Sequence, residues 1–191
     1  MKWHERLLWF LVGKHVEQRL GRKPAVNIGT YLESGYSVEG DRMERKEKLE
    51  AVCKSVVTGD RFKAKGKTTF CNQSVWETAA EMGYDIFRKK QMLAKDIIRH
   101  VKSSADWEEA SPERACEHAK RGNLAICGKQ YSTMDHVSTI YPTEMLFSGS
   151  WNKYVPLIAN VGKENGIMKV SQAFPVAEGE PQYWILVEGA I

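Results

Sequence analysis

Residues 67–77 read Lys-Thr-Thr-Phe-Cys-Asn-Gln-Ser-Val-Trp-Glu, and they join a short β-like approach to an amphipathic helix. The approach ends at Phe70, and apolar residues then recur at helical spacing over 71–82. Cys71 therefore lies at the predicted start of a helix. The unpaired N–H groups and the positive dipole end of a helix start favour the thiolate, which is the nucleophilic form of cysteine.

A histidine follows further along the chain, in the stretch Asp-His-Val-Ser-Thr-Ile-Tyr at 135–141. This run predicts a strand that begins at His136. A cysteine at a helix start followed by a histidine on a strand is typical of a cysteine hydrolase. Asn160 lies on the next predicted strand, within reach of His136 if the two strands are antiparallel neighbours. Asp135 ranks lower, because adjacent strand residues point to opposite faces.

The pattern predicts three catalytic roles: Cys71 as nucleophile, His136 as general base and Asn160 as the group that orients the base. The backbone N–H of Cys71 would supply one oxyanion donor. Each residue also has an ordinary interpretation, because a lone cysteine is often a small buried hydrophobe. His136 could be a core histidine, and Asn160 a turn residue. Their order and their elements together favour the catalytic interpretation.

The remaining cysteines show no metal-ligand spacing and no disulfide framework. Cys53, Cys116 and Cys127 lie on apolar faces of predicted helices or strands, and no CxxC pair is present. We therefore expect no zinc site. A free thiol at Cys71 indicates synthesis in a reducing compartment.

The charge of the chain is uneven. The 191 residues carry a net charge of +4, and residues 1–67 hold 15 Lys/Arg against 9 Asp/Glu. A basic N-terminal third favours an anionic partner, such as nucleic acid, a phospholipid surface or a cell-wall polymer. No nucleic-acid-binding motif accompanies the charge, so we expect no nucleic acid partner. The six Trp favour core packing over a polymer-gripping surface.

Residues 3–20 are predicted to form a helix with an apolar stripe. The stripe indicates packing on the core, and a cationic helix at an anionic membrane surface is the alternative for residues 1–20. Its longest apolar run, Leu7–Val12, is short for a signal peptide, and no apolar stretch approaches the ~20 residues that span a bilayer. We expect synthesis in the cytoplasm without a signal peptide.

The rest of the chain changes from helices to strands, which predicts an α+β fold with an antiparallel sheet of about five strands and helices on one side. Residues 1–66 are predicted to form a basic helical extension packed on the core, and 67–191 the hydrolase core. After a loop over 21–42, the predicted helices cover 43–57, 71–82, 90–103 and 112–121, the last capped by Ser111. The predicted strands cover 124–127, 136–141, 155–161, 168–174 and 183–187.

The segment 69–76 resembles the Cys–Asn–x–x–Val signature of papain-like cell-wall hydrolases of the NlpC/P60 and CHAP type, which include several phage lysins. Residues 135–137 are similar to the Gly–His–Val strand of that family. The resemblance covers roughly residues 67–187 and continues through 158–162 and the closing pairs 173–174 and 183–184.

The resemblance implies that Cys71 is the nucleophile, His136 the base and Asn160 the polar residue that orients it. It implies a papain-like fold and cleavage of an amide bond in peptidoglycan, without metal or cofactor. Two features depart from the family pattern: Asp135 replaces the usual glycine, and many relatives have a histidine where this chain has Asn160. The asparagine in place of a histidine bears most on the third role, in which Asn160 orients the base.

These observations predict a peptidoglycan endopeptidase or N-acetylmuramoyl-L-alanine amidase, with a phage endolysin as one such protein. It would be a monomer that acts at the cell wall or in the periplasm, in the host cell if phage-encoded. A papain-like hydrolase or acyltransferase acting on a protein or lipid is the second hypothesis. A non-enzymatic virion protein that retains the fold is the third.

Overall fold

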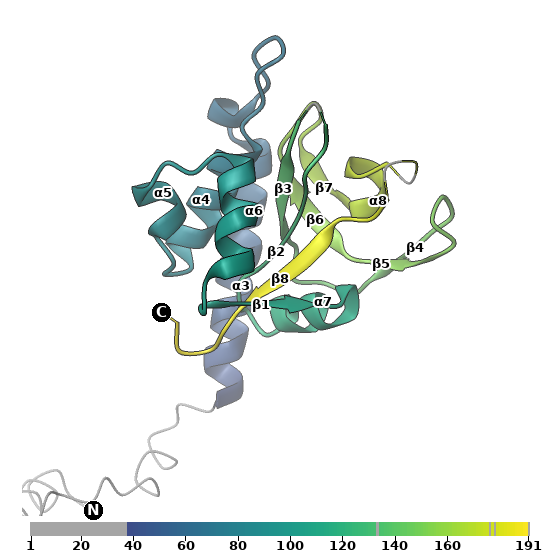
Figure 1. The fold of residues 1–191 in the computed structure, drawn as a ribbon. Coiled ribbons are helices and arrows are strands. Elements are labelled where there is room, and N and C mark those ends of the chain that lie inside the picture. The colour runs from purple at the N-terminus through teal and green to yellow at the C-terminus, as the bar shows by residue number, and fades with distance from the viewer. Residues whose placement is uncertain (1–37, 133, 176, 178, 191) are drawn as a thin grey trace, which may run out of the picture. The chain divides into compact units, whose positions relative to one another are not determined.

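A six-stranded antiparallel sheet runs through the middle of the structure, with helices on both faces (Figure 1). The computed structural model describes residues 38–191 except 133, 176, 178 and 191. The helix predicted over 3–20 and the proposed membrane contact of residues 1–20 lie outside the described residues. Residues Glu39–Ile191 form one compact unit.

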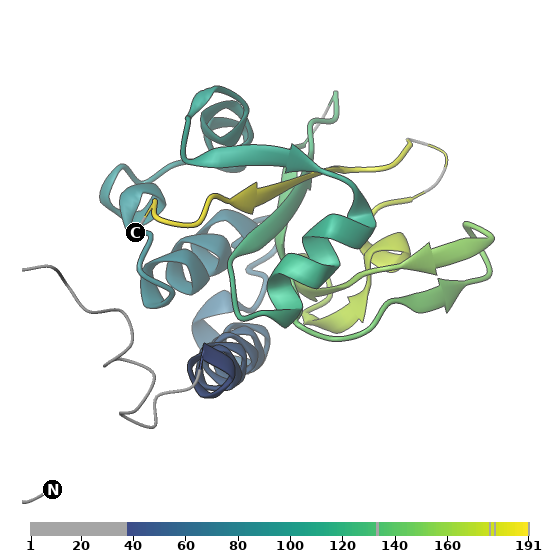
Figure 2. The same cartoon turned by 90° about the horizontal axis from the view of Figure 1, so that it is seen from below.

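The main sheet has the strand order β1-β8-β2-β3-β6-β7. Its strands are β1 Trp107–Ala110, β2 Ala125–Lys129, β3 His136–Ile140, β6 Leu157–Asn160, β7 Gly166–Lys169 and β8 Gln182–Leu186. A separate two-stranded sheet pairs β4 Leu146–Ser148 with β5 Lys153–Val155. In two perpendicular views this hairpin lies at the periphery of the molecule, beyond the main sheet (Figure 2).

The helices are α3 Val38–Thr58, α4 Cys71–Glu81, α5 Ile86–Lys89, α6 Ala94–Ser103, α7 Pro112–Lys120 and α8 Val170–Ala173, with a 3-10 turn at Asp60–Phe62. Helix α7 begins as predicted, because the Ser111 hydroxyl accepts a hydrogen bond from the N–H of Arg114 and Pro112 occupies the first turn. Within the described part, no helix is both long enough and apolar enough to cross a membrane.

Two apolar clusters form the core, one on each face of the sheet. On β2, Ala125 and Cys127 belong to the cluster under α3 and α7, whereas Ile126 belongs to the cluster under α4 and α6. This alternation follows from the pleat of the strand, which sends successive side chains to opposite faces. The strand is buried on both faces and therefore reads as a continuous apolar run.

The predicted α+β class and the antiparallel sheet are confirmed, with three corrections. Helices cover both faces of the sheet rather than one. The sheet has six strands rather than about five, because the charged stretch of β1 pairs with β8 at the edge. The strand predicted over 168–174 ends at Lys169, where the chain turns into α8.

Candidate active site

Helix α4 presents Cys71 as its first residue. The start of the helix is tied to a distant loop, since Asn72 Nδ2 and Trp76 Nε1 both donate to the carbonyl oxygen of Met92, at 3.1 and 2.8 Å. Val75 and Ala79 of α4 and Val137 of β3 belong to the same apolar cluster. These contacts hold the thiol at a defined place against the sheet.

The Cys71 side chain lies beside the peptide that joins His136 to Val137. Its thiol interacts with the amide N–H of Val137, and the residue is 6% exposed. Burial raises the pKa of the Cys71 thiol, and the backbone N–H groups of Val137, Asn72 and Cys71 only partly oppose this shift. The expectation that a helix start favours the thiolate is therefore wrong for this structure, since desolvation outweighs it. The resting side chain is the neutral thiol.

His136 opens β3 and makes two polar contacts through one ring nitrogen. Its Nε2 lies 2.8 Å from Asn160 Oδ1 and 3.3 Å from Ser138 Oγ. The ring also packs on Phe174, with 5.0 Å between ring centroids. Burial lowers the pKa of His136, and the hydrogen bond with Asn160 partly opposes this. The resting imidazole is neutral.

The amide orientation of Asn160 follows from its second partner. Asn160 Nδ2 lies 2.6 Å from the carbonyl oxygen of Glu164, and a carbonyl oxygen can only accept. The amide nitrogen must therefore face Glu164, and the amide oxygen must face His136. The turn after β6 is itself anchored, because Asn165 accepts from the N–H of Gly162 and donates to the carbonyl of Phe62.

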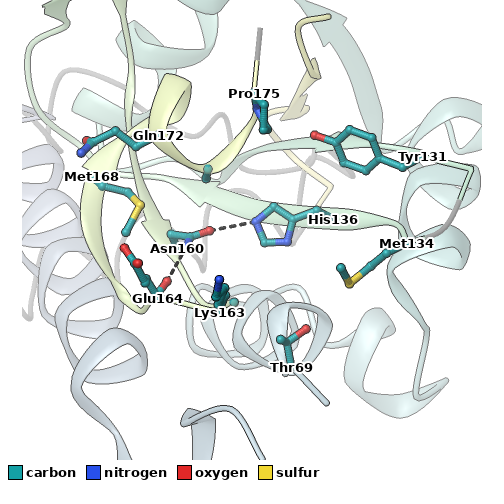
Figure 3. A pocket seen from close by; sticks show the side chains of 12 residues that line it. Thr69, Tyr131, Met134, His136, Asn160, Lys163, Glu164, Met168, Gln172 and Pro175 are labelled. Carbon is teal, nitrogen blue, oxygen red and sulfur yellow. Dashed lines mark hydrogen bonds between the residues drawn. The ribbon is translucent and has the colours of Figure 1, made fainter. Parts of the chain in front are cut away.

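The tautomer of His136 follows in turn. Because Asn160 Oδ1 is an acceptor, His136 Nε2 must carry the hydrogen, and Nδ1 of the neutral ring is then an acceptor. In Figure 3 the dashed line joins Asn160 to one ring nitrogen, and the other nitrogen faces away from Asn160, on the side where Thr69 is drawn. The nitrogen able to take a proton is thus the one that Asn160 leaves open.

A cleft of about 420 Å³ opens over His136 and Asn160 (Figure 3). Thr69, two residues before Cys71, lies in its wall. The remaining lining residues combine apolar and charged side chains: Tyr131, Met134, Gly162, Lys163, Glu164, Met168, Gln172, Ala173 and Pro175. The imidazole can therefore be reached from solvent through this cleft.

The structure brings His136 and Asn160 together in the cleft, whereas Cys71 lies beside β3 and is not one of the residues that line the cleft. His136 and Asn160 are in direct contact, and Cys71 lies against the residue that follows His136. The two side chains bonded to Nε2 are Asn160 and Ser138, whereas the Asp135 charge acts on Cys71 and adds to the rise of its pKa. Among the described residues, no three His, Cys, Asp or Glu side chains gather as metal ligands.

Three contacts of the site were not predicted: Ser138, Phe174 and the Glu164 carbonyl. Ser138 could have been found, because it lies two residues from His136 on the same strand and therefore on the same face. The ring contact of Phe174 and the backbone contact of Glu164 depend on how α8 and the β6–β7 turn pack. No residue pattern in the sequence indicates them.

No protein-family model matches this sequence, and no curated protein matches it at a significant level.

If His136 acts as a general base, removing the Asn160 side chain is expected to lower kcat/KM for the reaction at this site by about 10- to 100-fold. Asn160→Ala deletes a hydrogen bond that strengthens when the imidazole becomes charged, and such bonds contribute about 1.5–3 kcal/mol. Ser138→Ala removes only the longer 3.3 Å contact, so we expect a loss of about 5-fold. Steady-state kinetics of both variants checks the order, and a larger loss for Ser138→Ala would contradict it.

Proposed function

We propose that this protein is a papain-like cysteine hydrolase of the NlpC/P60 and CHAP type that cleaves an amide bond in peptidoglycan. The observation that carries the proposal is the Asn160–His136 hydrogen bond, which leaves His136 Nδ1 as a proton acceptor beside the strand position that the Cys71 thiol contacts. The sequence resemblance over 67–187 supplies the substrate class.

The reaction begins from a neutral pair. As the Cys71 sulfur attacks the carbonyl carbon of the scissile amide, the thiol proton passes to His136 Nδ1. Asn160 Oδ1 stabilises the imidazolium through Nε2–H. The N–H of Cys71, the first residue of α4, has no carbonyl within the helix to bond and can donate to the developing oxyanion.

The second half of the reaction returns the enzyme to its starting state. The imidazolium gives its proton to the leaving amine, the C–N bond breaks, and the acyl group remains on Cys71 as a thioester. A water molecule then loses a proton to His136 Nδ1 and attacks the thioester carbon. The S–C bond breaks, the thiolate recovers the proton, and the carboxylic acid product leaves.

The test of the proposal is digestion of purified peptidoglycan, with mass spectrometry of the released fragments. An endopeptidase releases fragments with shortened stem peptides and a new amino terminus, whereas an amidase separates intact stem peptides from the sugar. Either result supports the proposal and names the bond. If the protein released no fragments from peptidoglycan but cleaved a protein or lipid amide, peptidoglycan would be the wrong substrate for this site.

The pH profile of kcat/KM is expected to show a broad plateau. The active form needs a neutral imidazole and a neutral thiol, so activity is lost when pH falls through the His136 pKa, which lies below 6.5, and when pH rises through the Cys71 pKa, which lies above 9.0. Because Asn160 raises the His136 pKa, Asn160→Ala is expected to move the acid limb to lower pH. An acid limb centred above 6.5 in the native enzyme would contradict the neutral pair.

A further inference from the structure

The β4–β5 hairpin carries an exposed aromatic pair. Phe147 and Tyr154 lie directly opposite each other in the strand register, with ring centroids 5.6 Å apart and an edge-to-face angle of 71°. Their exposed fractions are 49% and 64%. Exposed apolar side chains gathered at one place mark interaction surfaces more often than single exposed residues do.

The pair faces away from the body of the protein. Ser148 is buried and donates to Ser171 Oγ of α8 at 2.7 Å, so the side of the hairpin that carries Ser148 packs inward. Since neighbouring strand residues point to opposite sides, Phe147 points outward. Trp151, at the turn of the hairpin, packs against the core instead.

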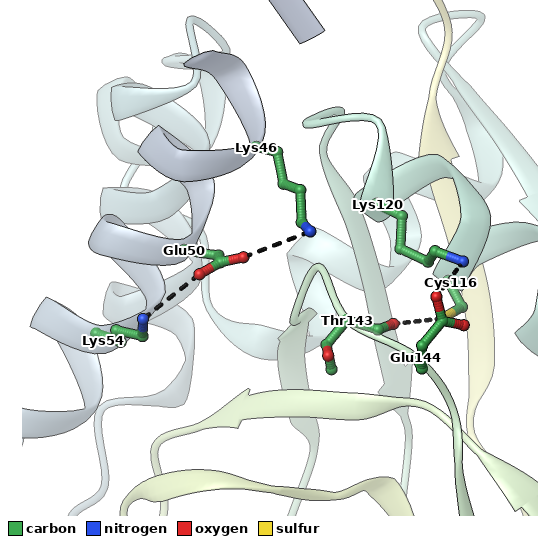
Figure 4. Close-up of polar contacts among 7 residues, drawn as sticks. All are labelled: Lys46, Glu50, Lys54, Cys116, Lys120, Thr143 and Glu144. Atoms are coloured by element: carbon green, nitrogen blue, oxygen red, sulfur yellow. Dashed lines mark hydrogen bonds and ion pairs between the residues drawn. The ribbon is translucent and has the colours of Figure 1, made fainter. Parts of the chain in front are cut away.

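The hairpin is bonded to the rest of the protein at its base. Before β4, Cys116 Sγ donates to the carbonyl of Thr143 at 3.0 Å, and Lys120 pairs with Glu144 at 2.7 Å (Figure 4). On the other side, Lys169 Nζ donates to the carbonyl of Phe147 at 2.9 Å. A surface that is already ordered loses little conformational freedom when it binds a ligand.

The hairpin and the cleft are joined by one short segment, residues 168–172. Met168 and Gln172 line the cleft, as Figure 3 shows, whereas Lys169 and Ser171 between them bind the hairpin. A polymer that contacts the hairpin can therefore extend to the cleft across this segment.

The side chains around the rings favour a sugar polymer over a membrane or a protein. Lys169 places a charged donor beside Phe147, because its Nζ bonds the Phe147 carbonyl. The turn of the hairpin carries the polar residues Ser150 and Asn152, which do not suit insertion among acyl chains. The exposed halves of two rings offer about 250 Å², whereas a specific protein interface needs about 500 Å² on each partner. Aromatic faces pack well against the C–H face of a pyranose ring.

We propose that Phe147 and Tyr154 form a docking surface for the glycan strand of peptidoglycan, which holds the polymer while an attached peptide enters the cleft. This inference rests on the proposed function. The ligand is a chain of N-acetylated hexosamines: its C–H faces pack on the rings, and its acetamido and hydroxyl groups bond to Lys169, which lies beside Phe147. The charge of Lys169 attracts the carboxylates of the attached peptides.

Binding to purified peptidoglycan sacculi tests this surface without hydrolysis. In a Cys71→Ala background, Phe147→Ala/Tyr154→Ala is expected to bind sacculi about 10-fold more weakly or worse. Peptide-free glycan strands should compete with sacculi for binding to the parent protein. Met43→Ala, which removes a side chain that is 57% exposed on α3, is the matched control and should bind as the parent does. Thermal melting verifies that each variant is folded.

Two substrates separate the docking surface from the cleft in otherwise native enzyme. The double variant is expected to lose far more activity on sacculi than on a glycan-free stem peptide. The docking surface would be overturned if the double variant lost equal activity on both substrates or bound sacculi as tightly as the parent. It would also be overturned if the substitutions weakened binding to lipid vesicles, or self-association, and left sacculus binding unchanged. Hairpin-dependent binding without any hydrolysis would overturn the proposed function and leave the docking surface standing.

Discussion

Replacing Cys71 by alanine is expected to lower kcat/KM for purified peptidoglycan by about 10⁴-fold or more, to the level of the uncatalysed background. In the proposed mechanism this sulfur forms the thioester, and Cys53 and Cys127 lie in the apolar cluster on the other face of the sheet. Cys71→Ala removes one atom from a helix start, so the melting temperature should change little. The measurement is fragment release followed by mass spectrometry.

The control for this variant is Cys53→Ala. Cys53 is fully buried on α3, where burial raises the pKa of its thiol to about 12, and it lies in the cluster on the other face of the sheet. This variant should keep nearly full activity. In the native protein, iodoacetamide should label Cys71 before Cys53 and Cys116. Hydrolysis that survives in Cys71→Ala would remove this residue as the nucleophile.

Replacing His136 by glutamine is expected to lower kcat/KM by about 10³-fold or more, because His136 is both the base and the acid of the proposed mechanism and a positioned general base contributes about 10²- to 10⁴-fold. Glutamine is a close match in size, and its amide N–H can still donate to Asn160 Oδ1. His136→Gln therefore removes the proton acceptor while it keeps the polar contact of the native ring.

The kinetic signature of His136→Gln distinguishes proton transfer from structural support. The limb that reports the His136 pKa should disappear in the variant. The residual rate should rise only at higher pH, where the Cys71 thiolate forms without assistance. A folded variant that retains the native acid limb would show that another group supplies the titration. Measurement of kcat/KM between pH 5 and pH 10, with a melting curve at each end, decides between the two.

The arrangement of helices and strands was largely predictable, because the apolar spacing in this chain is regular. The inner residues of α6, Ile97, Ile98 and Val101, follow helical spacing, and all three are buried. Strand β1 was not predicted because its sequence, Trp-Glu-Glu-Ala, shows no alternation of apolar and polar residues. Of these four residues, only Trp107 is buried. At a sheet edge, pairing through the backbone to β8 is enough to form a strand without an apolar pattern.

The candidate site was predictable in its residues and not in its electrostatics. Cys71, His136 and Asn160 could be chosen from residue type, order and element, and Asn160 was placed on the strand that pairs with β3. The direction of the Cys71 pKa shift depends on how far the thiol is buried under β3, and burial is a property of packing. The anchoring of Asn160 by the Glu164 carbonyl likewise depends on the path of a turn.

The four cysteines are all unpaired, and the sheet separates Cys71 from Cys53 and Cys127. A peroxide that reached Cys71 would form a sulfenic acid with no neighbouring thiol to capture it as a reversible disulfide. The high pKa of the thiol slows that oxidation, since the thiolate is the species that reacts. Burial of the Cys71 thiol, rather than capture by a second thiol, therefore limits its oxidation.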